Sequence, residues 1–121
     1  MKKIIWIILL AVILAAVFVF IFWPKESVEG KYDDFAQCLT DRGVVMYGAY
    51  WCPHCQNEKK AFAGSFRLVN YVECTEETDK CLAEKINGYP TWILSDGRRF
   101  EGETGLEKLS EASGCLLENK K

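Results

Sequence analysis

The chain begins with an unbroken apolar stretch. Residues 4–23 contain no charged or polar side chain, and two lysines come before them. A helix of this length spans about 30 Å, the thickness of the hydrocarbon core of a bilayer. The pattern therefore predicts a transmembrane anchor over residues 1–23. Because Lys2 and Lys3 precede the apolar stretch, the positive-inside rule puts the N-terminus in the cytoplasm and the rest of the chain outside it.

A cleaved signal peptide is the alternative to a retained anchor. Its apolar core would be about 7–15 residues long, and small residues would mark a cleavage site. Ala15 and Ala16 are the small pair in this stretch, and more apolar residues follow them. We therefore expect a single-pass signal-anchor in a cell membrane, with the domain on the extracytoplasmic side. Both alternatives export the domain.

After a polar linker over residues 24–31, the pattern changes to short helices and strands. Phe35, Cys38 and Leu39 have the i, i+3, i+4 spacing of one helix face, and Gly43 ends that helix. The β-branched, aromatic and small residues that follow predict a buried strand over 44–50.

A helix and a second strand are predicted after that buried strand. Helix formers begin at Pro53, a residue that suits the first turn of a helix, and extend to Gly64. A strand follows over 67–74. Thr75 then predicts the cap of a short helix over 76–86.

The last part of the chain predicts a hairpin and a closing helix. Strands over 91–94 and 98–101 flank an Asp-Gly turn, which is a strong hairpin signal. Thr104 and Glu107 have the spacing of a capping box, and Gly114 ends the helix that they would open. The order predicts an α/β sandwich in which the first two strands are parallel and the hairpin is antiparallel.

Charge and cysteine usage limit the possible functions. The whole chain has a net charge of −2, and the part after the anchor is more acidic because the two N-terminal lysines are left out. This balance argues against a nucleic-acid partner. The 6 cysteines all follow the anchor, and an even count outside the cytoplasm suggests disulfides.

Cys52 and Cys55 are separated by a proline and a histidine. Cys52 is predicted at the junction of a buried strand and a helix N-terminus, where free N–H groups and the helix dipole favour a thiolate. His54 lies between the two cysteines and can add charge or a hydrogen bond. The spacing lets Cys55 close a small disulfide ring, so the pattern favours a redox-active dithiol.

A zinc site and a purely structural bridge are the alternative roles for this pair. A zinc site needs four ligands, and the chain has no second pair of this spacing and only one histidine, so we expect no metal. A purely structural bridge between Cys52 and Cys55 would close too small a loop to restrict the unfolded chain much. A disulfide-stapled binding module with an inert pair stays open as an alternative function.

Pro90 is the second signal of dithiol chemistry. It opens a predicted strand that should lie next to the strand leading to Cys52. A trans turn proline is the common case, but a cis proline at this position would turn the preceding backbone towards the dithiol. We therefore expect the cis form.

Taken together, these motifs resemble a known family. The stretch "AYWCPHCQ", followed 35 residues after Cys55 by the proline of "GYPTW" and then by a hairpin and a helix, resembles the thioredoxin fold. The stretch from Phe35 to Cys115 looks like the thioredoxin-like domain associated with bacterial and archaeal homologues of vitamin K epoxide reductase. The resemblance implies a thioredoxin-like sandwich with a mixed four-stranded sheet over residues 32–116, followed by a polar tail over 117–121.

The resemblance also implies roles for individual residues. Cys52 would be the exposed nucleophile, Cys55 the resolving cysteine and Pro90 the cis proline that faces them, with Pro53 and His54 completing the catalytic loop. The residues expected to surround a bound substrate are Tyr50, Trp51 and Tyr89, the last through its backbone. No cofactor is needed beyond the redox-active disulfide.

One departure from the family bears on the direction of electron flow. Cytosolic thioredoxins carry a buried acid six residues before the first cysteine, and here that position is Met46. This favours an oxidase over a reductase. We expect a standalone, monomeric, membrane-anchored enzyme that donates disulfides to cysteine-containing exported proteins and is reoxidised by a membrane quinone reductase of the vitamin K epoxide reductase type. A reductase or isomerase that uses the same dithiol is the alternative.

The four remaining cysteines are expected to form structural disulfides. Cys74 ends a central strand and Cys81 lies in the following helix, so a local bridge is feasible. Cys38 and Cys115 lie in the first and last helices of the domain, and a bridge between them would close a long loop and stabilise the fold most. The rival for the Cys74–Cys81 pair is a second redox relay.

Overall fold

A computed structural model describes residues 1–23 and 29–118 of the 121-residue chain. The helices are α1 (Lys2–Phe22), α2 (Asp33–Asp41), α3 (Pro53–Ala61), η1, a 3-10 helix (Ala63–Leu68), α4 (Thr78–Ala83) and α5 (Leu106–Ser113). The strands are β1 (Val45–Gly48), β2 (Tyr71–Glu73), β3 (Thr91–Ile93) and β4 (Arg99–Glu101). The predicted linker and tail lie outside the described residues at 24–28 and 119–121.

α1 is the helix that the apolar N-terminal stretch predicts. It covers 21 residues, none of which is buried against the rest of the chain. Its length and composition are those of a helix that can cross a membrane.

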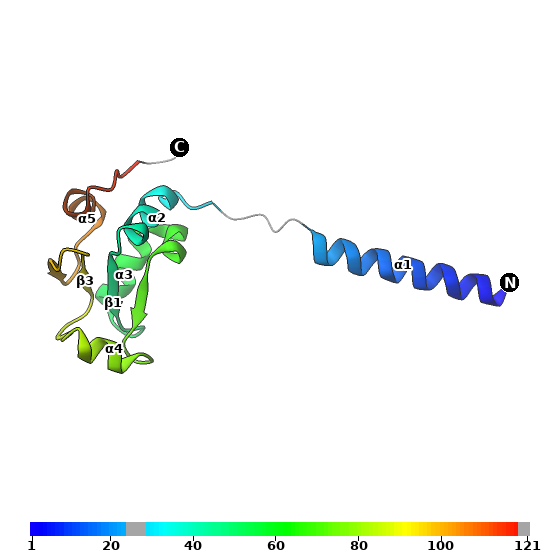
Figure 1. Cartoon of the computed structure of the whole chain (residues 1–121), viewed down its shortest axis with the longest axis horizontal. Coiled ribbons are helices and arrows are strands. Elements are labelled where there is room, and N and C mark those ends of the chain that lie inside the picture. Colours follow the sequence, from blue (N-terminus) through cyan, green and yellow to red (C-terminus); the bar gives the residue numbers. More distant parts are fainter. Residues whose placement is uncertain (24–28, 119–121) are drawn as a thin grey trace.

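The four strands form one mixed sheet in the order β2-β1-β3-β4, with β1 in its interior (Figure 1). β1 pairs with β2 in parallel, and β3 is antiparallel to both β1 and β4. The connection between the parallel strands carries α3 and η1, and a short turn joins the antiparallel strands β3 and β4. This arrangement confirms the predicted α/β sandwich.

Alternation along β1 divides the core into two clusters. Successive side chains of a strand point to opposite faces of the sheet. Met46 lies in the larger cluster with Trp92 of β3 and with residues of α2, α3 and α5. Tyr47, the next residue, lies in a smaller cluster with Val72 of β2 and the Cys74–Cys81 pair. The larger cluster buries one face of the sheet under several helices and supports the N-terminus of α3.

The second strand is shorter than predicted. Residues 67–74 were expected to be extended, but η1 continues to Leu68 and β2 begins only at Tyr71. Thr40 of α2 accounts for part of this difference, because its hydroxyl donates to the Leu68 carbonyl at 2.7 Å and accepts the Asn70 N–H at 3.0 Å. These side-chain hydrogen bonds take backbone groups that a longer strand would use.

Both predicted N-caps are wrong. α4 begins at Thr78, and the Thr75 hydroxyl instead donates to a carboxylate oxygen of Glu73 at 2.8 Å. At α5 the N-cap is Gly105 and there is no side-chain cap hydrogen bond from Thr104. A carboxylate oxygen of Glu58, on α3, accepts the N–H groups of Thr104 and Gly105 instead. Partners distant in the sequence have taken the place of the local caps.

Two disulfides close the domain. Cys38 bonds to Cys115 across a sequence separation of 77 residues, which joins α2 to the chain just after α5. Cys74 bonds to Cys81 across 7 residues, which joins the end of β2 to α4. These are the two pairs that the sequence suggested.

Candidate active site

Cys52 is the N-cap of α3 and follows β1 by a tight turn. Its N–H donates to the Ala49 carbonyl at 3.1 Å, and its own carbonyl accepts the Gln56 N–H at 3.1 Å. Pro53 occupies the first helical position, where an N–H would have no partner within the helix. The turn and the helix start together fix where the first sulfur lies.

Cys52 and Cys55 are both free thiols. Cys52 is 6% exposed and Cys55 is fully buried. The resemblance implied an exposed nucleophile, whereas Cys52 turns its sulfur inwards, towards the carbonyl oxygen of Tyr89, at 3.6 Å. Of the two sulfurs, that of Cys52 is still the one closer to solvent.

The Tyr89–Pro90 peptide bond is cis. Pro90 is buried at the start of β3, next to the strand that leads to the dithiol. The carbonyl of Tyr89, the residue before this proline, accepts the weak hydrogen bond from the Cys52 thiol just described. A backbone carbonyl therefore marks the position opposite the first cysteine.

Burial raises the pKa of the Cys55 thiol to about 11. The backbone of Ala49 and the charge of Lys59 act in the opposite direction, while the neighbouring Cys52 thiol raises the pKa further. Cys55 is therefore a neutral thiol near pH 7 whenever the pair is reduced. It must lose a proton before it can attack a disulfide.

Gly48, the last residue of β1, leaves room for close contacts around Cys55. A Cβ atom at this position would lie 2.9 Å from the Cys55 sulfur and 3.2 Å from the Tyr71 hydroxyl oxygen. Any larger residue would force one of these groups to move. The glycine thus lets the Tyr71 side chain face the buried sulfur.

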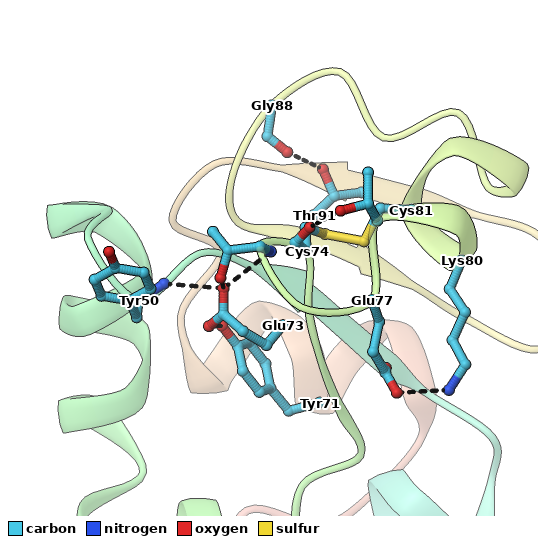
Figure 2. The surroundings of a disulfide bond; sticks show 11 residues. Tyr50, Tyr71, Glu73, Cys74, Glu77, Lys80, Cys81, Gly88 and Thr91 are labelled. Carbon is cyan, nitrogen blue, oxygen red and sulfur yellow. Dashed lines mark hydrogen bonds and ion pairs between the residues drawn. A yellow bond between two sulfur atoms is a disulfide. The ribbon is translucent and has the colours of Figure 1, made fainter.

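Tyr71 and Glu73 form a hydrogen-bonded pair on β2. The Tyr71 hydroxyl donates to Glu73 Oε2 at 2.7 Å. Glu73 Oε1 accepts the Tyr50 N–H at 3.2 Å and the Thr75 hydroxyl at 2.8 Å. Figure 2 shows the Glu73 carboxylate between the Tyr71 ring and the Tyr50 backbone, beside the Cys74–Cys81 disulfide. The carboxylate links the strand end to the turn before the dithiol.

Partial burial works to raise the pKa of Glu73, but hydrogen bonds from Tyr71, Thr75 and Tyr50 outweigh it and hold the pKa below its usual value. The pKa of Tyr71 is raised, first by burial and then by the Glu73 carboxylate and the two cysteine sulfurs. At neutral pH the pair is a tyrosine hydroxyl that donates to an ionised carboxylate.

The side chain of Lys59, on α3, packs over the Tyr71 ring. Its ammonium lies 3.8 Å from the centre of the Tyr71 ring, a cation–π distance. The edge of Phe66 meets the same ring at a centroid distance of 5.6 Å. The tyrosine is therefore held in one orientation from several sides.

His54 forms a contact with Glu103 at the surface. Its Nδ1 lies 2.6 Å from a carboxylate oxygen of Glu103, and its side chain is 67% exposed. Asn57 donates to the same Glu103 oxygen at 2.9 Å, and the hydrogen bonds from Asn57 and His54 hold the pKa of Glu103 below its usual value. The structure thus gives His54 a surface partner on the loop before α5, where the sequence suggested a hydrogen bond to the cysteine pair.

The predicted substrate-side residues lie at the surface beside the dithiol. Tyr50 is 67% exposed and Trp51 is 58% exposed. The Trp51 and Tyr89 rings meet edge to face at a centroid distance of 6.0 Å. Exposed aromatic side chains next to a buried thiol pair can hold an extended peptide.

Residues 1–23 and 29–118 contain no group of three or more His, Cys, Asp or Glu side chains that could hold a metal ion. Cys52 and Cys55 are free thiols, and the Tyr89 carbonyl lies against the Cys52 sulfur.

Sequence reasoning missed Gly48, Lys59 and Tyr71 around Cys55, and Glu73, which is hydrogen-bonded to Tyr71. Met46 pairs with Tyr71 across the parallel strands, and alternation along β1 puts Met46 and Gly48 on the same face. The register of the two strands, which the sequence left open, brings the tyrosine to the dithiol.

Comparison with known proteins identifies a family and relatives to which this chain is similar. The model of the family described as Thioredoxin matches residues 25–113. The thiol-disulfide oxidoreductase LTO1 of Arabidopsis thaliana is 37% identical over 92 residues, which cover 69% of this chain and 24% of that protein. A protein disulfide-isomerase of Humicola insolens is 33% identical over 76 residues, which cover 55% of this chain and 15% of that protein. The chain therefore spans at most about a quarter of the length of these curated relatives.

Two solved structures are similar to part of this chain at a lower level. Chloroplastic thioredoxin z has a TM-score of 0.49 and 23% identity, with 59% of this chain and 74% of that chain covered. Thioredoxin of Fasciola hepatica has a TM-score of 0.46 and 26% identity, with 59% and 76% covered.

Proposed function

The chain belongs to the thioredoxin family, and on this premise we propose that it is a thiol–disulfide oxidoreductase whose redox centre is the Cys52–Cys55 pair. The observation that carries the proposal is the placement of two free thiols at the start of α3, opposite the Tyr89 carbonyl. Thiols in a structural role would be expected to be bonded, as the other four cysteines are.

The reaction proceeds through a mixed disulfide. In the oxidised chain, a substrate thiolate attacks the Cys52 sulfur, the Cys52–Cys55 bond breaks, and its electron pair goes to the Cys55 sulfur, which takes up a proton. A second substrate thiolate then attacks the substrate sulfur of the mixed disulfide and releases Cys52. The substrate loses two electrons and two protons, and the chain gains them as a dithiol.

The burial of the two sulfurs supports this assignment of roles. Cys52 has some exposure, while Cys55 has none. An incoming thiolate therefore meets Cys52 first, and Cys55 acts as the resolving cysteine and leaving group. Pro53 sets the start of the helix, and Pro90 holds the Tyr89 carbonyl opposite Cys52.

Disulfide donation is the direction that we propose. Met46 is fully buried at the strand position where a reducing thioredoxin would carry an acid. Electrons taken from substrates would pass to a membrane quinone reductase of the vitamin K epoxide reductase type, which would restore the Cys52–Cys55 disulfide. No further cofactor is required for the exchange itself.

We assign the anchoring of the enzyme to residues 1–23 and the catalysis to residues 32–116. α1 has the length and the composition of a membrane span. Lys2 and Lys3 before it favour a cytoplasmic N-terminus and an extracytoplasmic domain. Both disulfides of the domain are then in a compartment where disulfides persist.

The substrates are cysteine-containing exported proteins in unfolded or flexible form. Trp51 and Tyr50 present exposed aromatic surface for an extended segment. When a substrate cysteine bonds to Cys52, the Tyr89 carbonyl is positioned to accept an N–H of that segment. A monomer suffices for every step.

Isomerase or reductase activity at the same dithiol is the second candidate. The relative in Humicola insolens is called a protein disulfide-isomerase, and it is 33% identical over 76 residues. An isomerase needs the reduced pair to attack a wrong disulfide, so Cys52 would be the first nucleophile. Cys55 would then attack the mixed disulfide and release a substrate that has not rearranged.

The proposal is tested with the full chain in detergent micelles. The oxidised chain is mixed with a reduced, unfolded test protein, and the loss of thiols in that protein is followed. We expect one disulfide transferred per chain in the absence of another oxidant, and none from Cys52→Ser. Transfer by Cys52→Ser at the wild-type level would refute the assigned centre. No transfer to the reduced protein, together with rearrangement of a disulfide-scrambled test protein by the reduced chain, would favour the isomerase.

A further inference from the structure

Cys55 must exchange a proton in every cycle, yet its thiol is fully buried. Burial also favours its neutral form, as the raised pKa shows. Met46, on the strand beneath the pair, offers no proton acceptor. A proton path to Cys55 therefore has to come from another direction.

The space above Gly48 connects Cys55 to Tyr71. The sulfur of Cys55 and the hydroxyl oxygen of Tyr71 would lie 2.9 Å and 3.2 Å from the same Cβ position at Gly48. The two groups therefore lie close to the same point over Gly48, a residue that has no side chain to separate them.

The orientation of the Tyr71 hydroxyl suits proton transfer. Its hydrogen is committed to Glu73 Oε2 at 2.7 Å, so its remaining lone pairs are available to accept a hydrogen from another donor. Lys59 over the ring and Phe66 at its edge keep the phenol in place.

Glu73 connects the phenol to solvent. Its carboxylate accepts the exposed Thr75 N–H and hydroxyl as well as the Tyr71 hydroxyl, and the residue is only partly buried. Its lowered pKa keeps it ionised at neutral pH, so that it can take a proton briefly and release it to water.

We propose that Tyr71 and Glu73 form the path by which protons pass between Cys55 and solvent, a role that rests on the proposed redox function of the dithiol. When Cys55 attacks the mixed disulfide at Cys52, the Cys55 proton moves to the Tyr71 oxygen while the Tyr71 hydroxyl proton moves to Glu73 Oε2. The Cys55 electron pair forms the bond to the Cys52 sulfur, and the bond between Cys52 and the partner sulfur breaks, so that the partner sulfur leaves as a thiolate. When Cys55 leaves as a thiolate, the same protons return from solvent in reverse order.

Other ionisable groups lie near the pair in sequence. Glu58, the buried acid one turn beyond Cys55 on α3, accepts the N–H groups of Thr104 and Gly105 through one carboxylate oxygen. Its other carboxylate oxygen is buried with no hydrogen-bond partner among the described residues, but Glu58 is not among the groups that shift the pKa of Cys55. His54 is paired with Glu103 at the surface. The groups that face the Cys55 thiol electrostatically are Cys52 and Lys59 from α3, and Tyr71 from β2.

The test separates the steps of the two cysteines. The full chain in detergent micelles, with only the Cys52–Cys55 pair reduced, is mixed with dithiobisnitrobenzoate, whose thiol product is coloured. Attack by Cys52 releases the first coloured thiol, and attack by Cys55 on the resulting mixed disulfide releases the second. The first phase therefore reports Cys52 and the second phase reports Cys55.

Tyr71→Phe and Glu73→Gln remove the two groups of the path with little change in shape. We expect each to slow the second phase about tenfold or more at pH 7 and to leave the first phase within about twofold. The double variant should be no slower than the slower single variant, because both residues serve one path. In Tyr71→Phe and Glu73→Gln the second-phase rate should rise about tenfold per pH unit. The Cys55 thiol must then lose its proton before it attacks, without the path that accepts this proton in the wild type.

Tyr47→Phe and Glu76→Gln are matched controls. Tyr47 is a buried tyrosine in the smaller core cluster, and Glu76 is exposed in the turn after β2. Both controls should keep wild-type rates in both phases. Glu73→Gln keeps the test decisive if Tyr71→Phe fails to fold, because its side chain is partly exposed.

The outcomes distinguish this proposal from the function on which it rests. A wild-type second phase that persists unchanged in Tyr71→Phe and Glu73→Gln overturns the proton path alone. Equal slowing of both phases, with an unchanged pH profile, also overturns it, because the residues would then be structural. No second phase in the wild type overturns the redox function and the path together.

Discussion

The sulfur of Cys52 lies 3.6 Å from the carbonyl oxygen of Tyr89. This contact joins the N-terminus of α3 to the start of β3, two parts of the chain that the central strand holds side by side. The first cysteine of the pair therefore faces a backbone acceptor, and the buried second cysteine lies, with the tyrosine on β2, around the empty position at Gly48.

Removal of the resolving cysteine should trap substrates. In Cys55→Ser the Cys52 thiolate can still attack a substrate disulfide, but the resulting mixed disulfide cannot be released by attack from within the chain, so covalent complexes with exported proteins should accumulate several-fold over wild type. Non-reducing gels of membranes that express the full chain would measure this. The double variant Cys52→Ser/Cys55→Ser is the control, and complexes of equal abundance in it would contradict the assigned nucleophile.

Gly48→Ala should damage both the fold and the dithiol. The added methyl would lie 2.9 Å from the Cys55 sulfur, a contact that requires the neighbours to shift. Overpacking of this kind costs about 1–3 kcal/mol of unfolding free energy, which urea unfolding would measure. Gly88→Ala is the matched control, since an added Cβ there meets nothing within 4 Å. Equal stability of the two variants would show that the contact is unimportant.

The Cys55 thiol should lose its proton at a higher pH than an ordinary cysteine. In the reduced full chain, the carbon-13 shift of its Cβ should follow a midpoint at about 11, because burial disfavours the thiolate. The folded-state pKa exceeds the ordinary value of 9.0. The contribution of the neutral Cys55 thiol to the unfolding free energy is therefore complete below pH 9.0. It is lost as the pH rises through about 11. A midpoint at or below 9 would contradict the assigned environment.

The two disulfides should differ in their contributions to stability. In the chain-entropy model, a loop of 77 residues gains about 4 kcal/mol from closure and a loop of 7 residues about 2 kcal/mol. Replacing Cys38 and Cys115 by alanine should therefore lower the unfolding free energy more than replacing Cys74 and Cys81. Denaturant unfolding of the two double variants measures the difference.

The same variants test the rival role of the shorter bridge. If the Cys74–Cys81 bridge is structural, its removal should leave disulfide transfer by Cys52–Cys55 within about twofold of wild type, measured below the unfolding transition. Loss of transfer in a folded variant would instead make this bridge a second redox relay.

The architecture could be predicted from the sequence because its signals are local. Apolar length predicted α1, and the Asp-Gly turn predicted the hairpin of β3 and β4. Strand ends and caps were less predictable, because side chains distant in the sequence replaced local partners. Thr40 shortens β2, and Glu58 takes the place of the expected cap of α5.

The candidate site could also be predicted only in part from the sequence. The dithiol and the proline opposite it were visible as motifs. Tyr71 and Glu73 were not, because their place beside Cys55 depends on the register between β1 and β2 and on the empty position at Gly48. His54 was expected to act on the dithiol, and its partner Glu103 lies 49 residues further along the chain.

The equilibrium reduction potential of Cys52–Cys55 in the full chain, measured in detergent against a glutathione series with trapping of each cysteine, tests the central claim most directly. A disulfide donor should give about −120 to −180 mV. A value near about −270 mV would contradict disulfide donation and indicate a reductase, and a pair that does not titrate at all would contradict the redox function.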